Sequence, residues 1–189
     1  MNTDPQIVRI GAGISAQTAS GHLAQLSATG LVIAERLGRF TYHRIAGPEV
    51  AEMLESLSVL PLKTAVTRPA LHRAPAAERE ARCCYNHLAG RLGVAMADAL
   101  VARGFVTDLT SPALTPHGRT WATAQGIRHG PMRPCLDWSE RHPHFSGPFA
   151  TALFRRLEGT DAIRRGTGRA ITVTETGRLW LRTELELGA

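Results

Sequence analysis

ISAQTASGHLAQLSATGLVIAERLGRFTYHRI, residues 14–45, is the stretch that decides the fold of the N-terminal region. Ser15 is a good helix N-cap, apolar residues recur after it at helical spacing, and the run ends at Gly30. From Leu31 the pattern changes to two β-prone runs around Gly38. The stretch therefore predicts a short amphipathic helix followed by a hairpin with basic residues near its tip.

A second helix is predicted after Gly47 and Pro48, and Pro61 ends it. Its apolar residues share one face, and that stripe is wider than so small a region can cover alone. We therefore expect the chain to form a homodimer through this helix. The residues assigned to the dimer face are Val50, Met53, Leu54 and Leu57.

The C-terminal part of the chain contains an internal repeat. The first copy runs from Cys84 through HLAG (87–90), a helix to Leu100, and TPHGRTW (115–121). The second copy runs from Cys135 through HFSG (144–147), a helix to Leu157, and TETGRLW (174–180), with an insertion at residues 138–143. We expect two similar halves that pack about an approximate two-fold axis.

Composition favours an anionic partner and an intracellular location. The 22 Lys and Arg residues exceed the 16 Asp and Glu residues, which gives a net charge of +6 and a pI near 10.2. The sequence shows no secretory signal and no apolar run of membrane-spanning length, so we predict a cytoplasmic protein with no membrane partner. Three cysteines, two of them adjacent, do not make a disulfide framework, and we expect reduced thiols.

Residues 14–45 resemble the recognition helix and wing of ArsR-type regulators. The positions that carry the resemblance are Ile14, Ser15, Thr18, Ser20, His22, Leu23, Leu26, Gly30, Leu31, Tyr42, Arg44 and Ile45. The later motifs CYNHLAG and CLDWSERHPHFSG resemble those of a longer ArsR-type group with a C-terminal extension, so the resemblance covers most of the chain. It implies a transcriptional repressor that binds duplex operator DNA as a dimer.

ArsR-type regulators place further helices ahead of the recognition helix, whereas about a dozen residues precede it here. We therefore expect the N-terminal helices to be truncated. The resemblance implies an α+β, mostly helical fold: a winged helix-turn-helix followed by a two-copy helical repeat domain. The predicted organisation is a winged-helix region with its dimer helix at residues 1–62, a linker at 63–79, and an effector or dimer-support domain at 80–189.

Small or amide-bearing side chains on the outer face of the first helix are suited to approach base edges in a major groove. Basic residues on the hairpin are suited to contact phosphates or the minor groove. The predicted DNA-binding residues are Ser15, Gln17, Thr18, Ser20, Gly21, His22 and Gln25 on the helix, and Arg36, Arg39, His43 and Arg44 on the hairpin. The simpler interpretation is a plain helix and hairpin with solvated charges.

An alternative is a fragment of a flavin- or nicotinamide-binding oxidoreductase that uses the glycine-rich turn IGAGIS, residues 10–15. Glu35, about twenty residues on, fits that pattern. Ala16 at the third glycine position and the lack of a βαβ series downstream argue against it. The sequence carries no GxSxG, Walker lysine loop or HExxH motif, so we predict no enzyme and no cofactor.

The repeat domain contains a candidate effector site. Cys84 and His87 are three residues apart, and we expect them to share one face of a helix. In the second copy, Cys135 is close in sequence to Asp137, His142 and His144, and we expect these four residues to cluster. Such side chains can ligate a metal, but we favour buried packing between the halves and predict no metal. The candidate site for a small-molecule or metal effector, in a cleft between the halves, comprises Cys84, His87, Cys135, Trp138 and His144.

Overall fold

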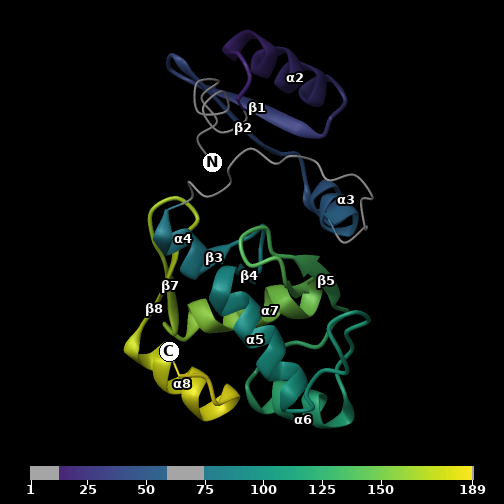
Figure 1. Ribbon diagram of the computed structural model, residues 1–189, viewed down its shortest axis with the longest axis vertical. Helices are drawn as coiled ribbons and strands as arrows, with labels where there is room; N and C mark the ends of the chain where they lie inside the picture. Colours follow the sequence, from purple (N-terminus) through teal and green to yellow (C-terminus); the bar gives the residue numbers. More distant parts are fainter. Residues whose placement is uncertain (1–12, 59–74, 189) are drawn as a thin grey trace. The chain divides into compact units, whose positions relative to one another are not determined.

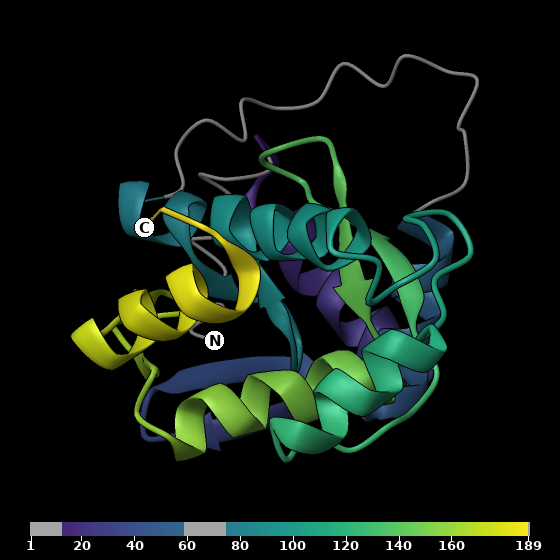
Figure 2. The same ribbon diagram turned by 90° about the horizontal axis from the view of Figure 1, so that it is seen from below.

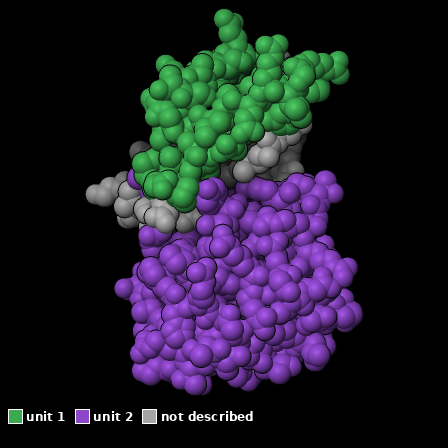
Figure 3. All heavy atoms as spheres, turned by 180° about the vertical axis from the view of Figure 1, so that it is seen from behind, with its two compact units in different colours: residues 1–54, 61–73 green, residues 55–60, 74–189 purple. Residues whose placement is uncertain are grey.

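The computed structural model describes residues 13–58 and 75–188 of the chain (Figure 1, Figure 2). They divide into two compact units (Figure 3). The first contains the described residues up to 54, and the second contains those from 75 onward together with 55–58. Most of the predicted linker, residues 63–79, lies outside the described residues, but its last part forms α4, Ala76–Glu80.

The first unit begins with the predicted helix, α2 (Ala16–Ala28). The side chain of Ser15 caps it by accepting a 3.1 Å hydrogen bond from the backbone N–H of Thr18. The chain leaves the helix through Gly30, whose φ of +74° lies in the left-handed region that glycine adopts without strain. The start and end of this helix therefore agree with the sequence prediction.

The predicted hairpin consists of β1 (Val32–Leu37) and β2 (Phe40–Ile45), paired antiparallel. Leu37 pairs with Phe40, which leaves a two-residue turn of Gly38 and Arg39. Gly38 has a φ of +61°, as expected for the tight turns whose twist matches that of the strands. A third element, α3 (Pro48–Ser58), follows the hairpin.

Exposed apolar side chains follow one another along α3, whose residues 55–58 belong to the second unit. Met53, Leu54 and Leu57 are 44%, 46% and 52% exposed, whereas Ala51 is buried. The residues predicted to form the dimer face therefore point away from the interior of this chain, with Val50 half-buried. A stripe of this kind is usually covered by another molecule.

The second unit is made of two successive halves (Figure 1). Each half contains a hairpin, a long helix, a short paired segment and a closing helix. The first half comprises β3 (Arg82–Cys83), β4 (Leu88–Ala89), α5 (Gly90–Ala102), an isolated bridge between Val106 and Leu114, and α6 (Pro116–Ala124). The second comprises β5 (Arg133–Leu136), β6 (Pro143–Ser146), α7 (Pro148–Gly159), β7 (Ile163–Arg165), β8 (Ile171–Val173) and α8 (Glu175–Leu185).

The closing helices α6 and α8 begin in the same way. Thr115 and Thr174 cap them, each accepting a hydrogen bond from the backbone N–H three residues on, at Gly118 and Gly177. A Cβ atom on Gly118 would lie 1.9 Å from the carbonyl oxygen of Phe105, and one on Gly177 would lie 2.0 Å from that of Ala162. Only glycine allows so close an approach between helix and backbone.

The two tryptophans of the T..GR.W motifs exchange equivalent contacts. The Nε1–H of Trp121 in α6 donates to Oε2 of Glu184 in α8 at 2.9 Å. The Nε1–H of Trp180 in α8 donates to Oε1 of Gln125, which follows α6, also at 2.9 Å. Each acceptor lies four residues after the tryptophan of its own half, so the contacts are reciprocal between the halves.

The core of the second unit lies where α5, β6 and α7 meet. Leu100, Phe149 and Phe154 are almost completely buried there. Burial of one such side chain stabilises a fold by about 1.5–3 kcal/mol. A cavity of about 30 Å³ among these apolar side chains has room for a group no larger than a water molecule, and none of the residues assigned to the predicted cleft lines it.

All strand pairs in the described part of the chain are antiparallel and belong to two-stranded sheets. A dinucleotide-binding fold requires parallel strands joined by helices. Here α2 leads directly into an antiparallel hairpin, which argues against the oxidoreductase alternative. Within the same residues, every helix is too short or too polar to cross a bilayer.

Candidate functional site

The outer face of α2 carries the polar residues that the sequence predicts as base-reading. Leu23 on the opposite face is half-buried, and Ala19 is buried. We expect Ala19, Leu23 and Leu26 to pack inward from their helical spacing, but 38% of the surface of Leu26 is exposed. The exposed predicted residues are Ser15, Gln17, Thr18, Ser20, Gly21, His22 and Gln25.

The first turn of α2 carries a capping hydroxyl and no acidic side chain. The hydroxyl of Ser15 lies 2.8 Å from that of Thr18, so the two side chains support each other at the helix start. No acidic residue lies in the first turn. The partial positive charge of a helix N-terminus therefore remains available to an anion there.

The predicted cations of the hairpin have different surroundings. The Arg39 guanidinium lies 5.0 Å from the ring centroid of Phe40, and Arg36 donates a long, 3.4 Å hydrogen bond to the carbonyl oxygen of Gly38. Arg44 instead forms a 2.7 Å ion pair with Glu35 across the hairpin. His43 is half-buried. Arg36 and Arg39, next to the turn, are thus better placed for phosphate contacts than Arg44 or His43.

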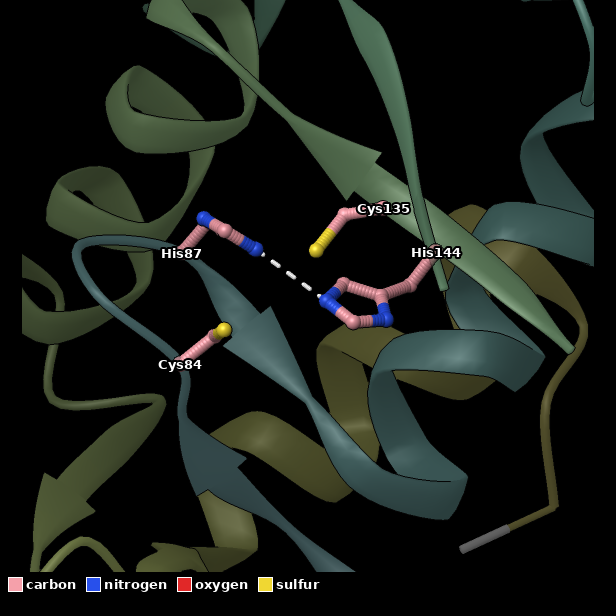
Figure 4. A group of neighbouring side chains, drawn as sticks. All are labelled: Cys84, His87, Cys135 and His144. Atoms are coloured by element: carbon pink, nitrogen blue, oxygen red, sulfur yellow. Dashed lines mark hydrogen bonds between the residues drawn. The ribbon is translucent and has the colours of Figure 1, made fainter. Parts of the chain in front are cut away.

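Four of the five residues of the candidate effector site converge in the second unit: Cys84, His87, Cys135 and His144 (Figure 4). Their sulfur and ring-nitrogen atoms all lie within 4.8 Å of one another. Nε2 of His87 is 3.1 Å from Nε2 of His144. Cys84 is half-buried and the other three are buried.

The local structure around Cys84 and His87 corrects the sequence prediction. Both residues lie in the turn between β3 and β4, where the N–H of Cys84 donates to the carbonyl oxygen of His87 at 2.9 Å. They do not share a helical face. Cys135 and His144 are directly opposite each other on β5 and β6. The cluster therefore joins two hairpins that belong to separate sheets.

The two adjacent cysteines are in different environments. Contacts with Cys135, His144 and His87 outweigh burial and hold the pKa of the Cys84 thiol far below its usual range. Burial raises the pKa of Cys83, whose sulfur lies outside the cluster, 3.5 Å from the carbonyl oxygen of Tyr85. Only one thiol of the pair therefore takes part in the cluster.

A buried ion pair between Arg82 and Asp137 lies next to the cluster. Arg82 donates to Oδ1 of Asp137 at 2.7 Å, and the backbone N–H of Gly90 donates to Oδ2 at 2.7 Å. Burial alone would raise the pKa of Asp137, but these hydrogen bonds outweigh it and keep the pKa well below its usual range. Oδ2 also lies 3.5 Å from Nδ1 of His144. This is a charge contact and not a hydrogen bond, so Asp137 lies beside an imidazole of the cluster without a hydrogen bond to it.

The chain is 35% identical over 194 residues to YdfF of Bacillus subtilis (strain 168), which is described as an uncharacterized HTH-type transcriptional regulator. The similarity covers 93% of this chain and 82% of that protein. This chain belongs to the helix-turn-helix transcriptional regulators. No protein-family model matches the regulator, and no solved structure matches it.

The structure of the regulator separates Trp138 and His142 from the cluster. Trp138 lies against Arg82, with the guanidinium 4.2 Å from its ring centroid, and so supports the buried ion pair. His142 contacts Asp98 at 3.0 Å on the surface. The sequence analysis missed Arg82, since its partner lies 55 residues away and no local pattern links them. The only available signal was its position next to the cysteine pair.

Proposed function

We propose that the chain is an ArsR-type winged-helix repressor that binds operator DNA as a homodimer. The observation that carries this proposal is the capped helix α2, whose polar face is exposed and which is followed at once by a hairpin with arginines at its turn. Winged-helix proteins place such a helix in the major groove and the hairpin against the neighbouring backbone. The similarity to an HTH-type regulator supports the same assignment.

The homodimer would form through α3. The half-exposed side chains of Met53, Leu54 and Leu57 give that helix an apolar face without cover in its own chain among the described residues. A two-fold dimer buries the same face of both copies. The operator is then an inverted repeat with half-sites about one helical turn apart.

A salt titration of DNA binding by the intact chain tests the proposal. Arg39→Ala should weaken binding to all sequences about equally and lower the slope of log K against log salt by about 1. Gln17→Ala should change the sequence preference instead. Arg155→Ala is the matched control, because Arg155 is exposed on α7 in the second unit. Absence of any DNA binding at low salt would contradict the proposal.

Light scattering tests the dimer separately. Leu57→Glu places a charge in the apolar face of α3 and should convert a dimer to monomers at micromolar concentration, with a matching loss of operator affinity. Leu179→Glu is the control, since Leu179 is a 60% exposed leucine of α8. A wild-type chain that is monomeric at the same concentration would contradict this part of the proposal.

We also propose that the two halves of the second unit are copies of one repeat, and that the unit is an effector or dimer-support module. The equivalent helix caps and the reciprocal tryptophan contacts support the repeat. The cavity in the apolar core holds a group no larger than a water molecule, so an organic effector would have to bind elsewhere or rearrange the core. A signal can act only by favouring one arrangement of the DNA-binding units over another.

A further inference from the structure

Neither DNA binding nor dimerisation through α3 uses the side chains of Cys84, His87, Cys135 and His144. Three of them are buried, and burial of polar groups is unfavourable unless they are satisfied. They come from two hairpins, and the two histidines, His87 and His144, are separated by 57 positions along the chain. Packing alone explains a buried cysteine, but not four ligand-type atoms directed at one point.

The separations within the cluster match those around a tetrahedral ion. Zn–N bonds of about 2.0–2.1 Å set two nitrogen ligands about 3.3 Å apart, and Zn–S bonds of about 2.3 Å set two sulfurs about 3.8 Å apart. The two Nε2 atoms of His87 and His144 are 3.1 Å apart, and every pair of ligand atoms lies within 4.8 Å. The widest pair would have to close by up to about 1 Å, and the two nitrogens open slightly, to complete the coordination sphere.

Both imidazoles have an oxygen atom beside the ring nitrogen that faces away from the cluster. Nδ1 of His144 lies 3.5 Å from Oδ2 of Asp137, and Nδ1 of His87 lies 3.3 Å from Oδ1 of Asn86. Only the His87 contact is a hydrogen bond, and the His144 contact is a charge contact. With a proton on each Nδ1, the Nε2 lone pairs would be directed inward. Metal-binding histidines are commonly oriented in this way by a carboxylate or amide oxygen.

We propose that Cys84, His87, Cys135 and His144 together bind one Zn²⁺ ion in a tetrahedral Cys₂His₂ site. Two thiolates and two imidazoles form the ligand set that a borderline-soft divalent ion prefers in four-coordinate geometry. All four positions are filled by protein atoms, so no position is open for a reacting water. The site holds the β3–β4 turn against the β5–β6 hairpin, and it does not depend on how the chain binds DNA.

Metal binding to the full-length chain tests this assignment. The protein is stripped with a chelator under reducing conditions and titrated with Zn²⁺, and then with Co²⁺ as the spectroscopic probe. We expect one ion per chain, the visible absorption of tetrahedral cobalt, and a sulfur-to-cobalt charge-transfer band in the near ultraviolet. Bound Zn²⁺ should also protect Cys84 and Cys135 from alkylation, a readout that needs no variant.

Adjacent residues supply matched controls. Cys135→Ser should roughly halve the charge-transfer intensity and weaken Zn²⁺ binding by at least about tenfold, because one of two thiolates is lost. Cys83→Ser should leave both unchanged, since that sulfur lies outside the cluster. His144→Gln should likewise weaken binding, and His142→Gln should not. Circular dichroism of each apo variant identifies any that fails to fold. If one does, protection of Cys84 and Cys135 from alkylation by Zn²⁺ in the wild-type chain tests the site instead.

Three results would overturn the proposal. The first is an apo wild-type chain that takes up no stoichiometric Zn²⁺ or Co²⁺. The second is equal loss of binding in Cys83→Ser and Cys135→Ser, which would place the ion elsewhere. The third is a reduced chain that ignores both metals but readily forms a Cys84–Cys135 disulfide, which would make the cluster a redox pair.

Discussion

The two units of the regulator differ in the size of the side chains that they bury. In the first unit, the buried side chains among the described residues are two alanines, Ala19 and Ala51. In the second, a continuous core contains whole aromatic and aliphatic side chains, with Phe149 completely buried. Core burial is the main source of stability, so the second unit can hold its own fold. In the first unit, by contrast, large apolar side chains such as Leu37 and Met53 are exposed.

Ion pairs show the same difference. Arg44 and Glu35 pair in the first unit with 54% and 59% of their side chains exposed. Arg82 and Asp137 pair in the second with 1% and 0% exposed. Exposed pairs contribute little to stability, whereas a buried charge that loses its partner is strongly destabilising. Removal of one charge from an ion pair should therefore change the free energy of unfolding little in the first unit and strongly in the second.

The largest expected effect comes from removing one buried charge. Asp137→Asn leaves the Arg82 guanidinium buried without a counter-ion and should lower the free energy of unfolding by about 3–5 kcal/mol. Glu35→Gln, the matched change in the exposed pair, should cost less than about 1 kcal/mol. Urea denaturation of both variants measures the difference. Similar losses would show that the two units do not differ in this way.

Glycine-to-alanine substitutions should have opposite effects on the stability of the two units. Gly118→Ala would force a methyl group into the carbonyl oxygen of Phe105, and should cost about 1–3 kcal/mol or more. Gly21→Ala meets no atom within 4 Å and should stabilise α2 by up to about 1 kcal/mol. Thermal unfolding checks both values. If Gly21 permits close approach to DNA, the second variant should bind DNA more weakly despite its greater stability.

The smallest expected effect tests the symmetry of the second unit. Glu184→Leu and Gln125→Leu each remove the acceptor of one tryptophan N–H, and each should cost about 1 kcal/mol. Gln25→Leu, on the exposed face of α2, should leave the free energy of unfolding nearly unchanged. Denaturant midpoints of the three variants provide the test. Clearly unequal costs for the first two would argue against equivalent halves.

Short sequence patterns predict those elements whose structure depends on residues a few positions apart. The Ser15 cap and Gly38 turn predict α2 and its hairpin because capping and turn formation involve residues a few positions apart. The T..GR.W motifs likewise mark the starts of α6 and α8, whose caps are Thr115 and Thr174. In each case a single short segment contains all the atoms that form the structure.

The candidate cluster was less predictable because it depends on distant contacts. A spacing of three residues suits both a helical face and a tight turn, and the turn between β3 and β4 is what Cys84 and His87 adopt. Residue types alone predict either packing or metal binding. The approach of His87 to His144 arises only when the two hairpins meet.

The exposed leucines of α3 would make dimer formation depend on the concentration of the chain in the cell. Once a second copy covers them, dimer formation follows mass action, and the dimer population at low concentration varies with the square of the chain concentration. In the proposed dimer, occupancy of a two-fold operator would respond to copy number more steeply than it would for a monomer. A modest fall in synthesis would then lower that occupancy without any inducer.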